Sequence, residues 1–200
     1  MKQNSDKKII AVTGGVGSGK SSVCKYLADK GYPVVDCDDL SRKAAEDKDV
    51  LTKISDTFGS KFVKDGKLLR RALSREVFAD QQKTQKLNAI FHPVILEMLL
   101  EQIRQTKGKT VFVELQVPQK EIIDVFDVVW LVKCADDTAQ NRVATRDGRD
   151  KEEIKNLIAR QKSALEKAEK DKKTVVLTND GDLTDLYDKT DYLIKTALLP

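Results

Sequence analysis

The sequence predicts an α/β fold in which a parallel β-sheet is connected through helices, and three observations carry that prediction. Short valine-rich runs alternate with segments of helical periodicity. The first run leads through a glycine cluster directly into a helix, and several runs lack the polar alternation of a strand with one face in water. Of the 200 residues, 40% are hydrophobic, which is enough to form a core. A wholly disordered chain is therefore excluded.

The predicted strands are spread along the whole chain. The first, Lys8–Thr13, leads into glycines and then into a helix from Lys20 to Lys30, which stops at Gly31. The later predicted strands are Pro33–Asp36, Thr110–Leu115, Val128–Lys133 and Thr174–Leu177. Because parallel neighbours need long crossover connections, the helical segments between these runs favour a parallel sheet.

Two helical blocks separate groups of strands. The segment 38–108 shows no strand character and repeats its apolar residues at helical spacing, with Pro93 suited to the first turn of a helix. A densely charged block, 136–170, is divided into two helices by Asp147-Gly148-Arg149-Asp150. The sequence contains no repeat or flexible linker. We therefore expect one domain over residues 1–200, with a core at about 8–40, 108–135 and 174–198, a helical insertion at about 41–107 and a helical lid at about 138–170.

Composition narrows the class of partner. The 36 Lys and Arg residues against 32 Asp and Glu give a net charge of +4, which is too small and too scattered for general nucleic-acid binding but leaves small polyanions open. The polar N-terminal segment and short first apolar run contain no signal or membrane-spanning pattern, so we expect a cytoplasmic protein with no membrane partner. Three cysteines without CxxC spacing, Cys24, Cys37 and Cys134, are interpreted as reduced thiols.

A phosphate-binding motif lies between the first strand and the first helix. Gly14-Gly15-Val16-Gly17-Ser18-Gly19-Lys20-Ser21 satisfies the pattern GxxxxGK[ST] in the required strand–loop–helix setting. Backbone N–H groups and the positive end of the helix dipole would bind phosphate oxygens, which disfavours side chains at Gly14, Gly17 and Gly19. Lys20 would neutralise the β- and γ-phosphates, and Ser21 would offer its hydroxyl to Mg²⁺. The motif predicts MgATP binding by Gly15, Val16, Gly17, Ser18, Gly19, Lys20 and Ser21.

A dinucleotide-binding fingerprint is the alternative for the same glycines. Gly15-Val16-Gly17 opens a GxG pattern, but Lys20 occupies the place of the third glycine. The Gly-Lys-Ser ending also supplies a cation and a metal-binding hydroxyl that a pyrophosphate site does not require. The sequence therefore favours a nucleoside triphosphate loop.

Acidic residues close the second predicted strand and lie inside the third. Asp36 and Asp38 lie at the carboxyl end of a parallel strand, the edge at which such sheets bind ligands. Asp38 could accept the proton of a hydroxyl that attacks the γ-phosphate; alternatively, Asp38 or Asp39 caps the following helix. The role of Asp36 stays open. Glu114 is a candidate second acid that supports the metal through water.

Arginines in the charged block form a candidate lid. Arg142 and Arg146 share a face of a predicted helix because they are four residues apart, and Arg149 follows in the break. Planar guanidinium groups on a segment able to close over ATP suit the charge on a transferring phosphoryl group. A solvated charged face is the alternative. We favour functional roles for Arg142 and Arg146.

Three further arginines and one histidine lie in the helical insertion. Arg70, Arg71 and Arg75 could dock an anionic acceptor, although ion pairing with Asp65 or Glu76 explains some of them equally well. His92 is the only histidine. Packing or capping competes with substrate contact as its role.

Together these residues resemble the dephospho-coenzyme A kinase family from about Ile9 to Leu186. The segment 13–22 resembles the family's phosphate loop, and Asp36-Cys37-Asp38 followed by Arg42 resembles its DxDxxxR segment. The substrate-side signature is matched by Asp65-Gly66-Lys67-Leu68, Arg70, Leu73, Val77-Phe78 and Leu87-Asn88-Ala89-Ile90-Phe91-His92-Pro93. Its lid and the turn near the adenine are matched by Arg142-Val-Ala-Thr-Arg146-Asp147, Gln161 and Thr178-Asn179-Asp180-Gly181.

The resemblance implies a P-loop kinase-like sheet core with a helical substrate-binding insertion and a helical lid. It also implies MgATP-dependent phosphorylation of the ribose 3′-hydroxyl of dephospho-coenzyme A, giving coenzyme A, without an obligate protein partner. Lys20, Asp38 and Arg146 would be catalytic. Beside the loop residues, ATP would contact Ser22, Arg142 and Asn179, and the acceptor would contact Asp36, Arg70, His92 and Gln161.

The chain departs from the family pattern in the acceptor region. Pro118-Gln119-Lys120-Glu121 replaces the usual Pro-Leu-Leu-Phe-Glu, and Leu69 replaces a usual aspartate before Arg70. Two alternatives therefore stay open: another small-molecule P-loop kinase, and a catalytically silent nucleotide-binding regulator. Retention of Lys20, Ser21, Asp38 and Arg146 argues against the regulator.

Overall fold

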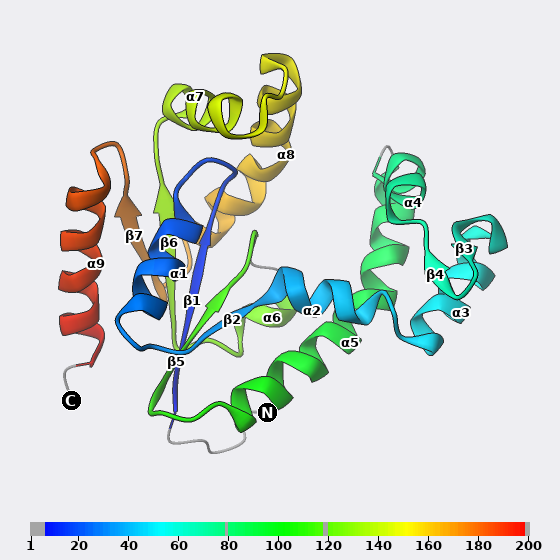
Figure 1. Ribbon diagram of the computed structural model, residues 1–200, viewed down its shortest axis with the longest axis horizontal. Helices are drawn as coiled ribbons and strands as arrows, with labels where there is room; N and C mark the ends of the chain where they lie inside the picture. The colour runs from blue at the N-terminus through cyan, green and yellow to red at the C-terminus, as the bar shows by residue number, and fades with distance from the viewer. Residues whose placement is uncertain (1–6, 79, 118–119, 199–200) are drawn as a thin grey trace. The chain divides into compact units, whose positions relative to one another are not determined.

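The computed structural model describes residues 7–78, 80–117 and 120–198, and its largest sheet has five strands (Figure 1). The strands are β1 (Lys8–Gly14), β2 (Val34–Asp36), β5 (Thr110–Glu114), β6 (Val128–Lys133) and β7 (Thr174–Thr178). They lie in the order β2-β5-β1-β6-β7. β1 pairs in parallel with β5 and β6, and β6 pairs in parallel with β7. The predicted parallel α/β fold and its five strands are confirmed.

The strand order places the end of β1 at a position typical of ligand binding. From β1 the chain passes through α1 (Lys20–Asp29) to β2 at one edge of the sheet, whereas β6 and β7 lie on the other side of β1. Ligands bind at the carboxyl ends of parallel strands where the chain connections diverge in this way. The register sets Val12 beside Glu114 and Gly14 beside Val132. The phosphate loop therefore begins at the switch point of the sheet.

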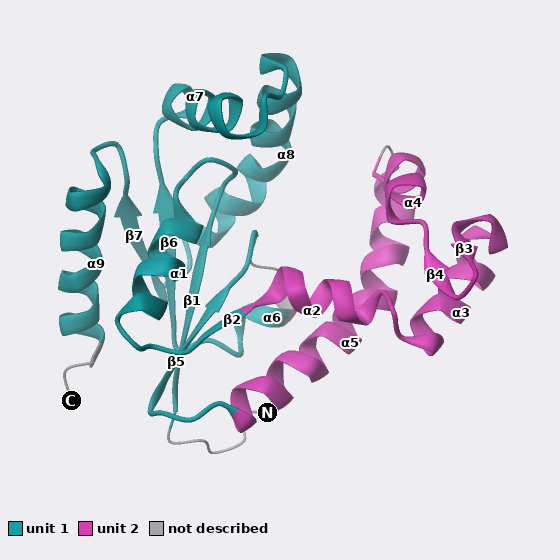
Figure 2. Cartoon of the chain, in the orientation of Figure 1, with its two compact units in different colours: residues 1–35, 106–200 teal, residues 36–105 magenta. Residues whose placement is uncertain are grey.

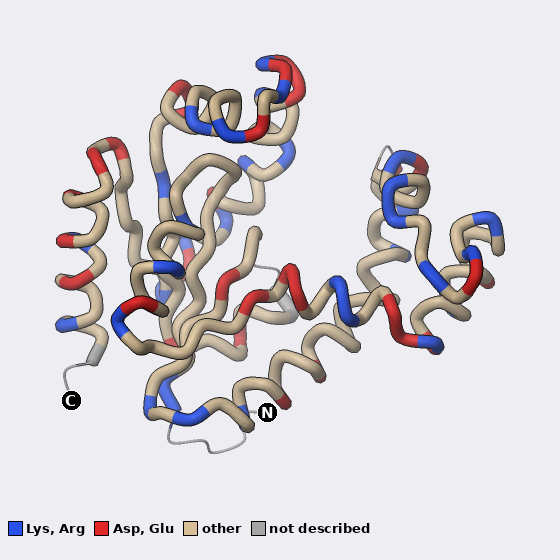
Figure 3. Tube along the Cα trace, viewed as in Figure 1, with Lys and Arg blue, Asp and Glu red and all other residues tan. Residues whose placement is uncertain are grey.

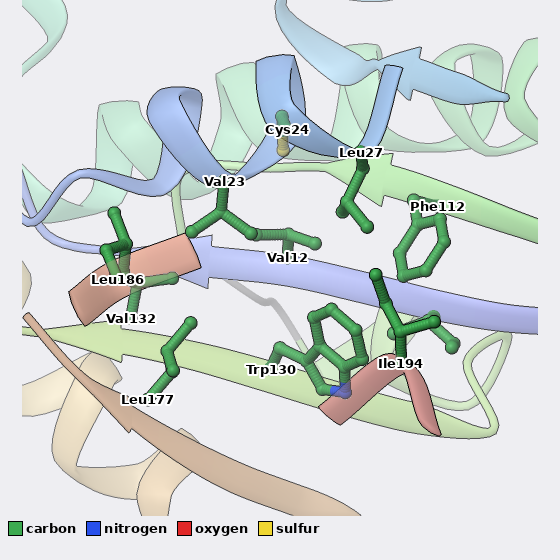
Figure 4. Close-up of a cluster of buried hydrophobic side chains, with 11 residues drawn as sticks. Val12, Val23, Cys24, Leu27, Phe112, Trp130, Val132, Leu177, Leu186 and Ile194 are labelled. Carbon is green, nitrogen blue, oxygen red and sulfur yellow. The ribbon is translucent and has the colours of Figure 1, made fainter. Parts of the chain in front are cut away.

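A buried apolar cluster packs the sheet against α1 and α9 (Leu183–Leu198), as Figure 4 shows. The rings of Phe112 and Trp130 lie 5.2 Å apart between centroids, and Trp130 is almost fully buried. The buried members of the cluster are Ile10, Val12, Val23, Cys24, Leu27, Phe112, Trp130, Val132, Leu177, Leu186 and Ile194. Because apolar burial dominates folding stability, this cluster fixes α1, and with it the end of the phosphate loop, on the sheet.

The chain forms two compact units, which Figure 2 distinguishes: the sheet unit (1–35 and 106–200) and the helical unit (36–105). The helical unit contains α2 (Cys37–Ala44), α3 (Lys48–Phe58), a 3₁₀ turn (Ser60–Phe62), β3 (Val63–Lys64), β4 (Lys67–Leu68), α4 (Arg70–Val77) and α5 (Gln81–Gln105). It has an apolar cluster of its own, formed by Val50, Ile54, Phe62, Leu73, Val77 and Leu87. The single-domain boundaries given above stay a prediction.

Two expectations for the helical unit are wrong. The segment expected to lack strand character contains an antiparallel hairpin, β3 with β4, whose turn residues Asp65 and Gly66 have φ of 50° and 71°. Positive φ at both central residues is the geometry that an Asp-Gly hairpin turn prefers. Pro93 lies inside α5 rather than in a first turn. The helix persists through it because tertiary packing, here around Leu87 and Leu99, outweighs local propensity.

The charged block forms α7 (Asp136–Asp147) and α8 (Lys151–Glu169), after the short α6 (Lys120–Ile123). The predicted break between the two long helices is confirmed: Gly148 closes α7 with φ of 61°, and Asp150 caps α8 by accepting a hydrogen bond from the Glu152 N–H at 2.8 Å. Within the described ranges, no helix has the length and apolar character needed to cross a bilayer. Cys24, Cys37 and Cys134 are not joined in disulfides.

Candidate functional site

The phosphate loop joins β1 to α1, and its glycines are required by neighbouring protein groups. Gly17 and Gly19 have φ of 76° and 96°, which L side chains rarely adopt. A Cβ at Gly17 would lie 2.6 Å from the Ala139 carbonyl oxygen of α7, and a Cβ at Gly19 would overlap the Asn179 amide nitrogen. The sequence attributes these glycines to close phosphate approach. The structure adds that Ala139 of α7 and Asn179, the residue after β7, lie so close to the loop that they leave no room for a Cβ.

The polar groups of three distant segments contact the loop backbone. Gln161 of α8 accepts a hydrogen bond from the Val16 N–H through Oε1 at 2.9 Å. Asn179, just after β7, donates from Nδ2 to the Ser18 carbonyl at 2.7 Å. The Cys134 thiol lies 3.7 Å from the Gly17 carbonyl, and burial raises the pKa of that thiol. Loop amides thus have fixed directions before any ligand binds.

Lys20, Ser21 and Glu114 converge at the end of the loop. Lys20 Nζ lies 3.4 Å from Glu114 Oε1, and the Ser21 hydroxyl donates to the same oxygen at 2.6 Å. α1 supplies the first two residues, whereas Glu114 ends β5, beside β1. A hydroxyl and a carboxylate are the hard oxygen ligands that Mg²⁺ prefers, so this set fits a magnesium ion. Sequence reasoning gave Glu114 only a subsidiary role.

Arg142 is committed to the turn after β7. Its Nη1 donates to the Asn179 carbonyl at 3.1 Å and its Nη2 to the Gly181 carbonyl at 3.2 Å. Two donors of a planar fork fix both the position and the orientation of the turn that they bind. Arg142, predicted as an ATP contact, therefore contacts the protein turn beside the loop.

Arg146 lies at the exposed end of α7 and forms a bidentate pair with Asp147. Arg146 Nε and Nη2 donate to Asp147 Oδ1 and Oδ2 at 2.6 and 2.9 Å. This pairing raises the pKa of Arg146 and lowers that of Asp147. Arg149 Nε adds a second contact to Asp147, at 3.6 Å. Within the part of the chain that the structure describes, no hydrogen bond or ion pair joins Arg146 to the phosphate loop.

The acidic pair after β2 belongs to the helical unit and opens α2. Asp36 is the N-cap of α2, because its Oδ1 accepts from the Asp38 N–H at 2.8 Å. Asp38 and Asp39 lie in the first turn, and Asp39 pairs with Arg42. The alternative that Asp38 or Asp39 caps this helix is therefore wrong. The exposed Asp38 carboxylate lies one position beyond the cap, which leaves its predicted role as a base open to chemical test.

The basic cluster of the helical unit lies on α4. Arg70, Arg71 and Arg75 are all exposed, and Arg70 Nη2 donates to the Ser41 hydroxyl of α2 at 3.2 Å. Glu76 pairs instead with Lys61 at 2.8 Å and with Lys83 at 3.4 Å. Among the described residues, no ion pair joins these arginines to Asp65 or Glu76. That pairing, the alternative to anion binding, is wrong.

His92 and the altered acceptor segment complete the predicted set. His92 lies within α5 and is half-buried. Pro118 and Gln119 lie outside the described residues, and of Lys120 and Glu121 only the backbone is described, as part of α6. The predicted residues thus fall in two places: Lys20, Ser21, Arg142, Gln161 and Asn179 in the sheet unit, and Asp36, Asp38, Arg70 and His92 in the helical unit.

A pocket of about 300 Å³ adjoins the phosphate loop on the side of α7 and α8. The Lys133–Glu169 ion pair, 2.7 Å long, lies at its margin. Loop residues and the lid helices provide most of its lining, among them Gly15, Val16, Ser18, Ala139, Ile158 and Leu165. Sequence reasoning missed Ala139 and Leu165, which approach the loop glycines, because an alanine and a leucine in a helix carry no signal beyond burial.

Comparison with known proteins gives a consistent result. Residues 8–185 match the family model described as dephospho-CoA kinase. A dephospho-CoA kinase of Fusobacterium nucleatum is 36% identical over 191 residues, which cover 94% of this chain and 97% of the relative. One from Thermus thermophilus is 35% identical, covering 89% of this chain and 86% of the relative.

Solved structures agree in fold. The crystal structure of TT1252 from Thermus thermophilus superposes with a TM-score of 0.81 at 31% identity and covers 97% of this chain and 99% of its own. Shikimate kinase from Acinetobacter baumannii, at 18% identity and a TM-score of 0.52, covers 97% of this chain and 96% of its own. At that identity the likeness extends to the fold alone.

Proposed function

Because the chain belongs to the dephospho-CoA kinase family, we propose that it transfers the γ-phosphoryl group of ATP to the ribose 3′-hydroxyl of dephospho-coenzyme A, giving coenzyme A and ADP. The observation that carries the proposal is the convergence of Lys20 and Ser21 on Glu114 at the end of the phosphate loop. A bond forms between the acceptor oxygen and the γ-phosphorus, and the bond from that phosphorus to the β–γ bridging oxygen breaks. The hydroxyl proton leaves to a base.

The loop and Lys20 bind the nucleotide. Fixed N–H groups of the loop donate to phosphate oxygens, and the N-terminus of α1 adds the positive end of its dipole. The Lys20 ammonium, which pairs with Glu114 at 3.4 Å, is long enough in its stem to turn toward the β- and γ-phosphates. Ser22 and the turn that contains Asn179, fixed by Arg142, belong to the same nucleotide side.

Ser21 and Glu114 would hold Mg²⁺, the first directly and the second directly or through water. A bound Mg²⁺ would neutralise charge on phosphate oxygens. Glu114 accepts a hydrogen bond from Ser21, and this bond keeps the two oxygen ligands in one place. The ligand set is thus assembled by α1 and β5 before the nucleotide arrives.

The acceptor side is assigned to the helical unit and the lid. Asp38 takes the proton of the attacking hydroxyl, since its exposed carboxylate in the first turn of α2 is accessible to a bound ligand. Arg146 stabilises charge on the transferring phosphoryl group after exchanging Asp147 for the phosphate. Asp36, Arg70, His92 and Gln161 bind the acceptor, a molecule whose phosphate groups suit the exposed arginines of α4.

ATP consumption measured with and without dephospho-coenzyme A tests the proposal. We expect turnover that requires the acceptor, with ADP and phosphorylated acceptor formed in equal amounts. Nucleosides, shikimate and gluconate serve as alternative acceptors. Turnover on one of these alone would identify another small-molecule P-loop kinase. ATP binding without turnover on any acceptor would identify a regulator.

A further inference from the structure

Residues 178–181, the last residue of β7 and the turn after it, are held by hydrogen bonds from several elements of the sheet unit. The Asn179 N–H donates to the Lys133 carbonyl at 2.7 Å, and the Asp180 side chain accepts from the Ala135 N–H at 2.7 Å. Lys189 Nζ donates to the Thr178 carbonyl at 3.1 Å. With the two Arg142 bonds, β6, α7 and α9 all hold this turn. The backbone of this turn is therefore held in position, and so is the starting point of each of its side chains.

That side chain is Asn179, which is 3% exposed and reaches into the phosphate loop. Its Nδ2 donates to the Ser18 carbonyl at 2.7 Å in a buried hydrogen bond. The Ser18 hydroxyl is buried and has no hydrogen-bond partner within the described chain, so it makes no bond to this carbonyl. Among side chains, Asn179 is therefore the contact that sets the direction of the Ser18 carbonyl.

The direction of one carbonyl determines the direction of the next N–H. The Ser18 carbonyl and the Gly19 N–H belong to one planar peptide unit, in which they point in opposite directions. A Ser18 carbonyl that is held toward Asn179 therefore turns the Gly19 N–H away from Asn179. A donor fixed in this way binds an anion without first paying the entropy of orientation.

The backbone conformation of Gly19 also allows Asn179 to approach the loop closely. It has φ of 96°, and a Cβ at this position would overlap Asn179 Nδ2. The close approach and the left-handed backbone are thus two parts of one arrangement, which needs glycine in the loop and a short amide side chain at 179. A longer amide or an apolar residue at 179 would either collide with the loop or leave the Ser18 carbonyl without this donor.

We propose that Asn179 is a positioning residue of the nucleotide site: it acts through the Ser18–Gly19 peptide, from a turn that Arg142 fixes, and does not itself contact ATP. The inference rests on the proposed function only in so far as the loop binds phosphate; it does not depend on the acceptor. It assigns to Asn179 and Arg142 a shared task, whereas the sequence pattern predicts two separate ATP contacts.

Asn179→Ala tests the proposal by separating nucleotide affinity from acceptor affinity. We expect the Kd for MgATP to rise about tenfold or more, the factor that loss of a buried donor to a loop peptide produces, while the KM for dephospho-coenzyme A changes less than about twofold. Thr190→Val is the matched control. It removes a buried hydrogen bond of 2.7 Å inside α9, from Thr190 Oγ1 to the Leu186 carbonyl, and should leave both constants unchanged.

Wild-type protein supplies a second test that does not depend on the variant's folding. In ¹⁵N-resolved NMR spectra, addition of MgATP should shift the Gly19 backbone N–H strongly and leave the Asn179 side-chain amide signals nearly in place. A large shift of the Asn179 amide with an unmoved Gly19 N–H would overturn the inference, because Asn179 would then contact the nucleotide directly.

The outcomes separate this inference from the proposed function. Normal MgATP affinity in Asn179→Ala overturns the positioning role, even if dephospho-coenzyme A is phosphorylated normally. Conversely, a wild-type protein that binds MgATP and ignores dephospho-coenzyme A overturns the proposed acceptor, while the affinity comparison still tests Asn179. A wild-type protein that does not bind MgATP overturns both.

Discussion

The phosphate loop and the helical unit prepare for their ligands in opposite ways. In the loop, the Val16 N–H donates to Gln161 and the Ser18 carbonyl accepts from Asn179, and both of these side chains lie more than a hundred positions away in the sequence. Residues of α7 also approach the loop. The arginines of α4 project into solvent, and within the described chain neither Arg71 nor Arg75 has an ion-pair partner. The first region is held by hydrogen bonds from distant segments, whereas the second presents exposed charge.

The difference follows from the groups that each region uses. A backbone N–H can be aimed only by fixing its peptide unit, so a site built from amides must be tied to the rest of the fold. A guanidinium on a long side chain finds a phosphate by rotation about its own bonds, so an exposed helix suffices to carry it. Figure 3 shows basic positions on α4 and a mixture of both charges at the turn between α7 and α8. The Arg146–Asp147 pair belongs to that mixed turn.

The largest expected effect tests the fixed region. Lys20→Ala should lower turnover by about a thousandfold or more, because a cation placed at the transferring phosphates has no substitute in the loop. The circular dichroism spectrum and thermal midpoint should stay close to those of the wild type, since Lys20 lies outside the apolar cluster. Lys25→Ala, an exposed lysine on the same helix, is the control. Near-normal turnover in Lys20→Ala would contradict the phosphate-loop assignment.

The next effect tests the helical unit. Asp38→Asn keeps the size of the side chain and removes its basicity, so kcat should fall about a hundredfold, the scale of general base catalysis, with the KM for ATP little changed. Because Asp36 is the cap of α2, the substitution should leave stability unaltered.

The control for Asp38→Asn is the same change at another helix start. Asp47 caps α3 by accepting from the Asp49 and Val50 N–H groups, and asparagine caps about as well as aspartate. Asp47→Asn should therefore leave kcat unchanged. Full activity in Asp38→Asn would remove Asp38 from the mechanism and move attention to Asp36.

The same contrast governs what could be predicted from the sequence. The five strands, the break at Gly148 and the phosphate loop follow from local patterns: valine runs, a glycine, and a motif of fixed spacing. The contacts that orient the phosphate loop do not follow from local patterns. Asn179 reaches Ser18, and Glu114 reaches Lys20, only because of the strand order β2-β5-β1-β6-β7, and strand order is a property of the whole chain.

Errors in the helical unit have local causes too. The hairpin of β3 and β4 has strands of two residues, too short to show alternation, although its Asp65-Gly66 turn was visible in the sequence. Pro93 was placed at a helix start because proline lacks an N–H, a local argument that long-range packing of α5 overrides. The identity of the cap, Asp36 rather than Asp38, depends on where β2 ends, and such boundaries are poorly marked in a sequence.

A smaller effect tests the lid. Arg146 is exposed, as the arginines of α4 are, but it is also held by a hydrogen-bonded partner, as the loop is. Arg146→Lys should lower kcat about tenfold while the KM for ATP changes little, because lysine keeps the charge and loses the planar fork. Arg104→Lys is the matched control: Arg104 is an exposed arginine that also pairs with a carboxylate, through Nε to Glu101 Oε2 at 2.9 Å. Equal kcat values for Arg146→Lys and the wild type would return Arg146 to a solvated charged face.

The smallest effect concerns Glu76, which forms ion pairs with Lys61 and Lys83 rather than with the arginines of α4. The Lys61 hydrogen bond, supported by Lys83, holds the pKa of Glu76 below its ordinary value of 4.5. A carboxyl whose pKa is lowered by folding stabilises the folded state above its unfolded pKa, and this contribution disappears as the pH falls through the folded value.

Lys61→Met should therefore raise the pKa of Glu76, which carbon-detected NMR titration measures. The same variant should reduce the stability of the protein slightly at pH 7 but not at pH 2. Lys64→Met, an exposed lysine two residues past Phe62 and outside the ion pairs of Glu76, should move neither quantity. An unmoved pKa in Lys61→Met would mean that solvent already screens the pair, and the charges of the helical unit would then be as independent of one another as the exposed arginines are.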